Sequence, residues 1–298
     1  MKLHLLRIFT AVADQMSFSK AAETLYVSQP AVSKAVRELE NQLGQPLFER
    51  GAGKLSLTEA GALLAERGRA ILAIERTAEE DLQALRGLQH GVLRIGASTT
   101  IATYLLPPVI ATFLRNYPGI DLRLTILNTL SIVKLLLDYE IDVALVEGPV
   151  VDERIRSEAW RADEMVVIAA PDHPFVLQAG HEGIPISLLA EEVILVREPG
   201  SGTREVAEQA LAERGVRAKR TVQLGSTEAI KQAVAAGLGL AIVSKATIPD
   251  EVALHKLTTL RVQDLAIERT LTRLKLVGRT LSPAARAFDQ LLTEAQET

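Results

Sequence analysis

The sequence predicts an α/β protein with a separate helical segment at its N-terminus. Two features predict this class: helical periodicity governs roughly the first 88 residues, and after Gly91 apolar runs of strand length alternate with helical stretches. Such alternation is typical of a mostly parallel sheet covered by helices. The length of 298 residues favours two domains over one.

The composition excludes several classes of protein. Hydrophobic residues make up 48% of the chain and charged residues 23%, a balance that excludes disorder and fibres. The absence of cysteine excludes disulfides and thiolate metal sites. Arg7 and Asp14 interrupt the first apolar stretch, so we expect no secretory signal, no membrane partner and a cytoplasmic location. Residues 1–58 carry a net charge of +2 in a chain whose total is −4, which makes this end the better partner for a polyanion.

The N-terminal segment predicts three helices followed by a β-hairpin. Ser17 is placed to cap the short second helix, and the third helix has Ser28 as its N-cap, Pro30 in its first turn and its end near Gly44. The turn sequence Gly51-Ala52-Gly53 then joins two short alternating runs. A short helix, a tight turn, a second helix and a basic hairpin together predict a winged helix-turn-helix, whose second helix enters the major groove of DNA.

One face of the third helix carries side chains that suit DNA. Val32, Val36 and Leu39 face the core, and polar and basic side chains lie opposite. Arg and Lys donate to guanine edges and phosphates, and Gln, Asn and Ser contact bases or the backbone. The candidate DNA-contacting residues are Gln29, Ser33, Lys34, Arg37 and Asn41 on the helix, with Arg50 and Lys54 beside the hairpin tip. The alternative is a solvated helix face.

A long helix without proline is predicted from Glu59 to about Leu88, with Thr58 as its cap. Apolar residues recur every seven positions along it, at Leu64, Ile71, Ala78 and Leu85. A seam of this length predicts a partner helix, although Gly68 and Glu75 interrupt it. The alternative is a helix that packs on its own domain.

Several predicted strands of the remaining chain end in small hydroxyl or glycine residues directly before a helix. Backbone N–H groups and the positive end of the helix dipole favour anions at such ends, and open α/β sheets bind ligands there. Each residue alone is more often an N-cap. Their recurrence, and the guanidinium of Arg204, predict a site for a small anion. The candidates are Ser98, Thr99, Thr100, Thr129, Glu147, Gly200, Ser201, Gly202, Thr203, Arg204 and Thr227. Glu147 would repel a dianion, so it points away or the ligand carries an amine.

The N-terminal motifs resemble those of the LysR-type transcriptional regulators. The matching motifs are Phe18-Ser19-Lys20-Ala21-Ala22, Ser28-Gln29-Pro30-Ala31-Val32-Ser33, Leu39-Glu40, Leu43-Gly44, Leu47-Phe48, Arg50, Leu57-Thr58 and Gly61. The resemblance covers about 65 residues and carries DNA contact onto Gln29, Pro30, Ser33, Lys34 and Arg37, with Arg50 in the wing. It implies a homodimer or homotetramer on an inverted-repeat operator, with RNA polymerase as a further candidate partner.

The resemblance also implies how the chain is divided. The expected parts are a DNA-binding domain at 1–58, a linker and dimerisation helix at 59–88 and a periplasmic-binding-protein-like effector domain at 91–298. Two Rossmann-like subdomains, 91–163 with 268–298 and 164–267, are expected to close on the effector. The segment Gly200-Ser201-Gly202-Thr203-Arg204 resembles a subgroup tied to sulfur assimilation, which makes a sulfur oxyanion the leading effector and a small carboxylate the next.

Two other classes of protein fit the sequence less well. An enzyme is disfavoured because the chain has no GxSxG elbow, P-loop lysine or HExxH pair, and we expect no metal and no cofactor. A solute-binding protein of a transporter is disfavoured by the basic N-terminal segment and the missing signal.

Overall fold

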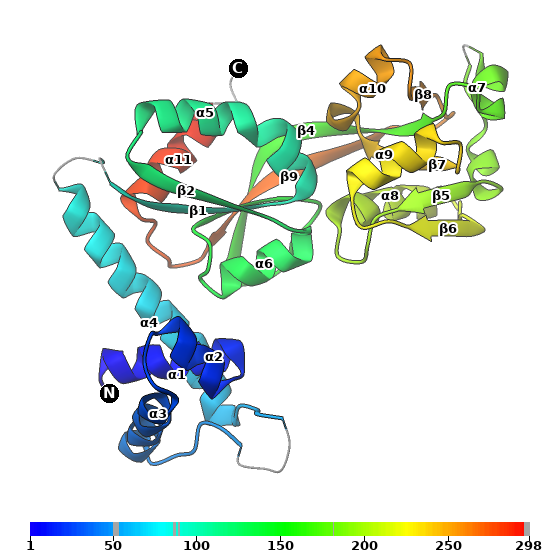
Figure 1. Cartoon of the computed structure of the whole chain (residues 1–298). Helices are drawn as coiled ribbons and strands as arrows, with labels where there is room; N and C mark the ends of the chain where they lie inside the picture. The colour runs from blue at the N-terminus through cyan, green and yellow to red at the C-terminus, as the bar shows by residue number, and fades with distance from the viewer. Residues whose placement is uncertain (50–53, 86–87, 89, 181, 295–298) are drawn as a thin grey trace. The chain divides into compact units, whose positions relative to one another are not determined.

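A computed structural model describes residues 1–49, 54–85, 88, 90–180 and 182–294 (Figure 1). The chain divides into two compact units, Met1–Leu82 and Gln83–Thr298, and each has its own hydrophobic core. The first unit is called the head and the second the body. No helix in the described ranges is long and apolar enough to cross a membrane.

Four helices build the head. They are α1 (Leu3–Gln15), α2 (Phe18–Thr24), α3 (Gln29–Leu43) and α4 (Glu59–Ala84). The hydroxyls of Ser17 and Ser28 accept backbone N–H groups at the starts of α2 and α3, and Gly44 ends α3 with a φ of +67°. Left-handed backbone of this kind favours glycine, because a Cβ would crowd the following carbonyl. The predicted caps and the predicted end of the third helix are confirmed.

A short antiparallel pair connects α3 to α4. Phe48 pairs with Leu57, and the buried carboxylate of Glu40 accepts the N–H of Leu47 at 2.8 Å. This bond ties the strand to α3 and satisfies a backbone donor inside the head. Arg50 and the three residues after it, which the sequence places in the hairpin turn, lie outside the described residues.

Helix α4 presents one face to the head and leaves another exposed. Gly68 packs closely on Leu6, and Leu64 packs against the head's core, whereas Ile71, Ala78 and Leu85 of the predicted seam are exposed. The exposed large apolar side chains of this helix, here called the α4 stripe, are Leu63, Ile71, Ile74 and Leu82. Leu63 and Ile74 are eleven residues apart, and so are Ile71 and Leu82. Eleven residues make three turns at 3.67 residues per turn, which is close to the period of an α-helix, so these side chains share one face.

The body contains, within its described residues, one continuous sheet of nine strands. The strands are β1 (Gly91–Ala97), β2 (Ile120–Ile126), β3 (Val143–Glu147), β4 (Ile155–Ala169), β5 (Val193–Val196), β6 (Arg220–Gln223), β7 (Leu240–Ser244), β8 (Thr258–Leu260) and β9 (Ile267–Leu276). Their order is β2-β1-β3-β9-β4-β7-β5-β6, with β8 beside β4. The expectation of a parallel sheet is wrong for the middle strands, because β4 runs antiparallel to β7, β8 and β9, and β9 antiparallel to β3.

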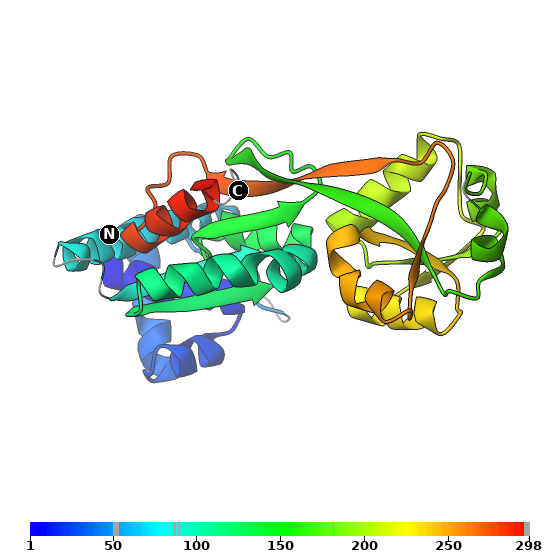
Figure 2. The same ribbon diagram turned by 90° about the horizontal axis from the view of Figure 1, so that it is seen from above.

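Two lobes form around the ends of the long strands β4 and β9, which run from one lobe to the other (Figures 1 and 2). Lobe 1 contains β1 to β3 with the π-helical segment η1 (Ile101–Leu105), α5 (Leu106–Asn116), α6 (Thr129–Leu137) and α11 (Pro283–Glu294). Lobe 2 contains β5 to β8 with α7 (Pro174–Ala179), η2 (Ile186–Ala190), α8 (Gly202–Ala212), α9 (Thr227–Ala235), η3 (Lys245–Thr247) and α10 (Pro249–Ala253). Each lobe has one apolar cluster on either face of its part of the sheet. The predicted subdomain boundaries at 163/164 and 267/268 fall where β4 and β9 pass from one lobe to the other, and they stay a prediction.

The first half of β4 could not be predicted as a strand from its sequence, and the sheet topology gives the reason. Residues 155–164 pair with β9 alone, whereas β7 joins β4 only from Met165 onward. On its other side β9 pairs with β3 over Leu271–Leu274, so this half of β4 is mostly the edge strand of lobe 1's part of the sheet, and β4 and β9 form a two-stranded ribbon only near 162–164 and 268–270. An edge strand with many exposed positions carries mostly polar side chains, so no apolar run marks it. β8 is only three residues long, too short for a periodic signal.

Gly61 gives a test of the head's packing. A Cβ at this position would lie 2.0 Å from the Leu47 carbonyl oxygen, whereas a Cβ at Gly68 meets only side-chain atoms, at 2.9 Å or more. Gly61→Ala should lower the free energy of unfolding of the head by about 2 kcal/mol, because overpacking outweighs the gain of roughly 1 kcal/mol in helix propensity. Gly68→Ala should cost less, since side chains can move. Urea denaturation measures both, and a Gly61→Ala head as stable as the wild type would contradict this packing.

Candidate functional site

The exposed face of α3 carries the residues predicted to contact DNA. Gln29, Pro30, Lys34 and Arg37 are exposed, and Ser33 is partly buried and accepts a hydrogen bond from the Gln29 amide at 2.9 Å. Among the described residues neither Lys34 nor Arg37 has an acidic partner, so both cations are available to an external anion. Lys54 is exposed as well, and Arg50 lies outside the described residues.

A buried carboxylate lies at the strand ends where the sequence predicts an anion site. Glu147 ends β3 and is 2% exposed. Its Oε1 accepts the Ser98 hydroxyl at 2.9 Å and the Thr100 N–H at 3.2 Å, and its Oε2 accepts the Thr203 hydroxyl at 2.5 Å. Ser98 and Thr100 belong to lobe 1 and Thr203 to lobe 2. Three predicted ligand-binding residues therefore bind a carboxylate of the chain itself, and this carboxylate joins the lobes.

Arg269 of β9 connects Glu147 to a second buried carboxylate. Its Nη1 lies 3.0 Å from Glu147 Oε2 and its Nε lies 2.7 Å from Asp163 Oδ2, and Asp163 also accepts the Ser244 hydroxyl at 2.6 Å. Burial raises the pKa of Glu147, but Arg269 and the surrounding donors outweigh burial and hold that pKa below its usual range. Glu147 is therefore an ionised, fully partnered group whose counterion is a guanidinium of β9.

A second buried guanidinium lies where the lobes meet. Arg197 follows β5 and its side chain is 5% exposed. Its Nη1 donates to the Thr227 hydroxyl at 3.1 Å, and its Nη2 lies 3.5 Å from the Thr99 hydroxyl of lobe 1. Its Nε and Nη2 donate to the two carboxylate oxygens of Glu198 at 2.9 and 3.0 Å. Two predicted ligand-binding residues, Thr99 and Thr227, are thus brought together by an arginine that was not among the candidates.

The glycine-rich turn between β5 and α8 allows close approach of the lobes. A Cβ at Gly202 would lie 2.0 Å from the Glu147 carbonyl oxygen, which also accepts the Thr129 hydroxyl at 3.0 Å. Gly200 accepts the N–H of Leu130 from lobe 1 at 3.1 Å. Ser201 is buried directly before α8.

Arg204 lies apart from these contacts. Its Nε donates to Glu208 at 2.8 Å, and its Nη1 donates to the Arg197 carbonyl at 3.1 Å and to the Gln223 amide oxygen at 3.3 Å. Its guanidinium therefore braces the turn that holds Arg197 and is shared among partners of lobe 2.

A further polar contact joins η1 to α9. The Tyr104 hydroxyl of lobe 1 hydrogen-bonds Glu228 and accepts from the buried ammonium of Lys231 at 3.0 Å. Lys231 also pairs with Glu251 at 2.8 Å. Burial lowers the pKa of Lys231, but the bonds to Glu251, Tyr104 and Glu228 outweigh burial and raise it above its usual value. Lys231 is thus fully engaged at neutral pH.

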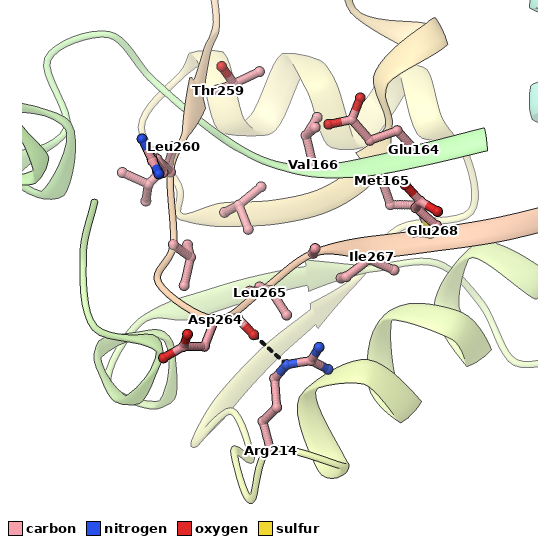
Figure 3. A pocket seen from close by; sticks show the side chains of 14 residues that line it. Glu164, Met165, Val166, Arg214, Thr259, Leu260, Asp264, Leu265, Ile267 and Glu268 are labelled. Atoms are coloured by element: carbon pink, nitrogen blue, oxygen red, sulfur yellow. Dashed lines mark hydrogen bonds between the residues drawn. The ribbon is translucent and has the colours of Figure 1, made fainter. Parts of the chain in front are cut away.

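The hollows of the body differ in their suitability for a ligand. The space that touches Arg197, Thr203 and Thr227 measures about 30 Å³, which is room for a water molecule or two. A larger hollow of about 610 Å³ lies between β4 and residues 259–268, where Arg214 donates to the Asp264 carbonyl (Figure 3). It is lined by apolar side chains and by three carboxylates, and none of the predicted ligand-binding residues reaches it. No group of residues in the described part of the chain is arranged to hold a metal ion.

Three residues that organise this site, Arg197, Asp163 and Arg269, were not among the residues predicted from the sequence. They differ in whether the sequence could have revealed them. Arg197 stands directly after the apolar run Val193–Val196, so the strand-end argument applied to Ser98 also applies to it. Asp163 and Arg269 lie inside β4 and β9, where the polar ribbon conceals strand structure, and only their pairing in three dimensions reveals them.

Two family models match the chain. The model for the bacterial regulatory helix-turn-helix protein of the LysR family matches residues 3–62, and the LysR substrate binding domain matches residues 86–297. The second match alone covers more than half of the chain.

Curated relatives match over nearly the whole length. A RuBisCO operon transcriptional regulator of Allochromatium vinosum is 42% identical over 98% of this chain and 96% of that protein. The HTH-type transcriptional regulator CbbR of Rhodospirillum rubrum is 36% identical over 99% of this chain and 97% of that protein. These relatives are regulators, which agrees with a non-enzymatic chain, and they do not confirm the resemblance to the sulfur-assimilation subgroup.

Solved structures show the same architecture. The CcmR regulatory domain of Synechocystis PCC6803 in complex with 2-PG is 32% identical, with a TM-score of 0.65 over 70% of this chain and 99% of that one. A full-length OxyR variant from Pseudomonas aeruginosa is 25% identical, with a TM-score of 0.76 over 98% of this chain and 94% of that one. The chain therefore belongs to the LysR family of DNA-binding transcriptional regulators and carries an N-terminal helix-turn-helix and a C-terminal effector-binding domain.

Proposed function

We propose that this regulator responds to a small anion bound between the two lobes, and that the leading candidate is 2-PG or a closely similar phosphorylated compound. The observation that carries the proposal is the buried guanidinium of Arg197, set between hydroxyls of both lobes. Arginine recognises oxyanions through paired donors, and threonine hydroxyls supply further ones. The likeness to a regulatory domain in complex with 2-PG favours this class over the sulfur oxyanion or carboxylate that the sequence predicts.

Binding of such an anion requires the lobes to move. The hollow beside Arg197 is too small for a compound of several heavy atoms, and the lobes touch through Glu147, Thr203 and Gly200. A ligand shifts an equilibrium only by binding one arrangement better than another. We infer that the effector selects a more open arrangement of the lobes and that this change alters how the heads engage DNA.

The proposed target is an inverted-repeat operator in the cytoplasm, bound by a homodimer or homotetramer. Two similar regulators carry the RuBisCO operon or CbbR in their names, so genes of carbon fixation are the first targets to examine. Fragments of the host genome selected by the purified protein, with and without 2-PG, sulfite or sulfate, test the operator and the effector together. Enrichment that no anion alters would contradict the proposed effector.

Arg37 is expected to read bases from α3. Arg37→Ala should weaken binding to a selected operator by about 10- to 100-fold and leave binding to random DNA much less affected, because a bidentate base contact is worth roughly 1–3 kcal/mol. Gel-shift titration at fixed salt measures both affinities. Arg115→Ala, which removes an exposed cation of the body, is the matched control. Equal loss on both DNAs would assign Arg37 to the phosphate backbone.

The α4 stripe is expected to form the dimer contact. Leu82→Glu should raise the dimer dissociation constant at least about tenfold, because it places a charge in an apolar seam. Gln83→Glu introduces the same charge at the adjacent exposed position, off the stripe, and should leave the dimer intact. Sedimentation equilibrium of the two variants measures the difference, and identical association would exclude the stripe as an interface.

Arg197 and Arg204 are separable by conservative substitution. Arg197→Lys keeps the charge but removes the planar pair of donors, so it should weaken 2-PG binding by about tenfold or more. Arg204→Lys should have a smaller effect, because Arg204 acts on the turn through the Arg197 carbonyl. Isothermal titration calorimetry of the full chain measures both. A larger loss of 2-PG affinity in Arg204→Lys than in Arg197→Lys would instead place the anion site at the glycine-rich turn, as predicted from the sequence.

A further inference from the structure

The donors of Arg197 are already occupied by a carboxylate of the chain. Glu198 presents its two oxygens to Nε and Nη2 of Arg197 at 2.9 and 3.0 Å. This is the parallel, two-bond geometry in which arginine recognises a carboxylate or phosphate of a ligand. Asn128 of lobe 1, the N-cap of α6, helps to lower the pKa of this carboxylate, and its side-chain amide lies 3.5 Å from the carbonyl of the next residue, Pro199. The pair of Arg197 and Glu198 therefore lies where the lobes meet, as a ligand held between them would.

The two members of this pair differ in their freedom to move. The Arg197 side chain is 5% exposed and is fixed by Thr227 as well, whereas the Glu198 side chain is 24% exposed. Glu198 can turn toward water at less cost than Arg197, because a carboxylate at the rim regains its hydration. The arginine is the fixed element and the carboxylate the replaceable one.

The charges make simultaneous occupancy unfavourable. Arg197 and Glu198 together are neutral, and the nearby cluster of Glu147, Asp163 and Arg269 carries one excess negative charge. A dianion added beside an ionised Glu198 would meet no uncompensated cation at this point. Burial raises the pKa of Glu198, but Arg197 and Asn128 outweigh burial and hold it below its usual value, so the group stays ionised at neutral pH.

We propose that Glu198 is an internal competitor that occupies the anion subsite of Arg197 and is displaced by the effector. The inference deepens the proposed function and rests on it. Glu198 raises the dissociation constant of the effector, because every anion that binds must first displace a carboxylate that the chain holds beside Arg197 at high local concentration. It also favours ligands with more negative charge than a carboxylate, because these compete best for the guanidinium.

Glu198→Gln tests this competition directly. The neutral amide keeps the size of the side chain and weakens its hold on Arg197, so 2-PG should bind the full-length variant about tenfold more tightly than the wild type. The gain should be smaller for the monoanion formate than for 2-PG. Asp152→Asn is the matched control, because Asp152 makes the same two-oxygen pair with Arg154, at 3.0 and 2.9 Å, outside the contact between the lobes. It should leave the affinity unchanged.

The outcomes separate the inference from the proposed function. Calorimetry with 2-PG, inorganic phosphate and formate is carried out on wild type, Glu198→Gln and Asp152→Asn, with melting temperatures to verify folding. Glu198→Asp, whose shorter side chain loses the paired geometry, provides a second variant and should also bind more tightly. Wild-type binding of 2-PG with equal or weaker binding by both Glu198 variants overturns the competitor role alone. Failure of every variant, the wild type included, to bind any of the anions overturns the proposed effector class and the inference with it.

Discussion

The body depends on one buried set of charges, which lies where the paired strands β4 and β9 pass from one lobe to the other. Arg269 lies between Glu147 and Asp163, and the three groups are almost fully buried. An isolated buried charge costs several kcal/mol, whereas a paired and hydrogen-bonded one is tolerated. Each carboxylate therefore needs its donors in place, and the donors come from both lobes: Ser98 from one, and Thr203 from the other. Removal of Arg269 would leave two buried carboxylates without a counterion, and removal of either carboxylate would leave its donors without an acceptor, so the set specifies this arrangement of the lobes.

The same chemistry recurs at the neighbouring turn. Helix starts, threonine hydroxyls and buried guanidinium groups form a region that favours anions, and the chain supplies carboxylates to it, Glu147 and Glu198. Glu198 thus neutralises Arg197 without a ligand. The proposed effector would meet an arginine that already has a carboxylate partner, and its affinity would be the difference between two sets of contacts.

Local features of the fold followed from the sequence, and long-range features did not. Ser17, Ser28 and Gly44 bound their helices as predicted because caps depend on neighbours within four residues. The exposed face of α3 followed from helical periodicity for the same reason. The mixed sheet escaped prediction because the first half of β4 is a mostly polar edge strand beside β9.

The meeting of the strand ends between the lobes was predicted, but only part of the residues that organise it. Strand ends with hydroxyls and glycines do meet between the lobes, yet Arg197, Asp163 and Arg269 organise them. Arg269 pairs with Asp163 and Glu147 over more than a hundred positions, and no local pattern encodes these contacts. Arg197, by contrast, directly follows a strand, which is a local signal. Arg204 shows the converse: the residue with the strongest local signal is engaged by Glu208 and by backbone.

The ribbon of β4 and β9 limits what any ligand can do to the body. Its backbone ladder runs from Ile155 to Met165 with one irregularity between Ala159 and Arg161, and it belongs to the single sheet that extends through both lobes. The lobes consequently cannot dissociate, slide or exchange partners, because such motions would break the ladder. The paired strands can still twist and bend without breaking their hydrogen bonds. An effector bound between the lobes, as proposed above, would therefore act on the body by rotating one lobe against the other, and the stiffness of the paired strands β4 and β9 would limit the rotation.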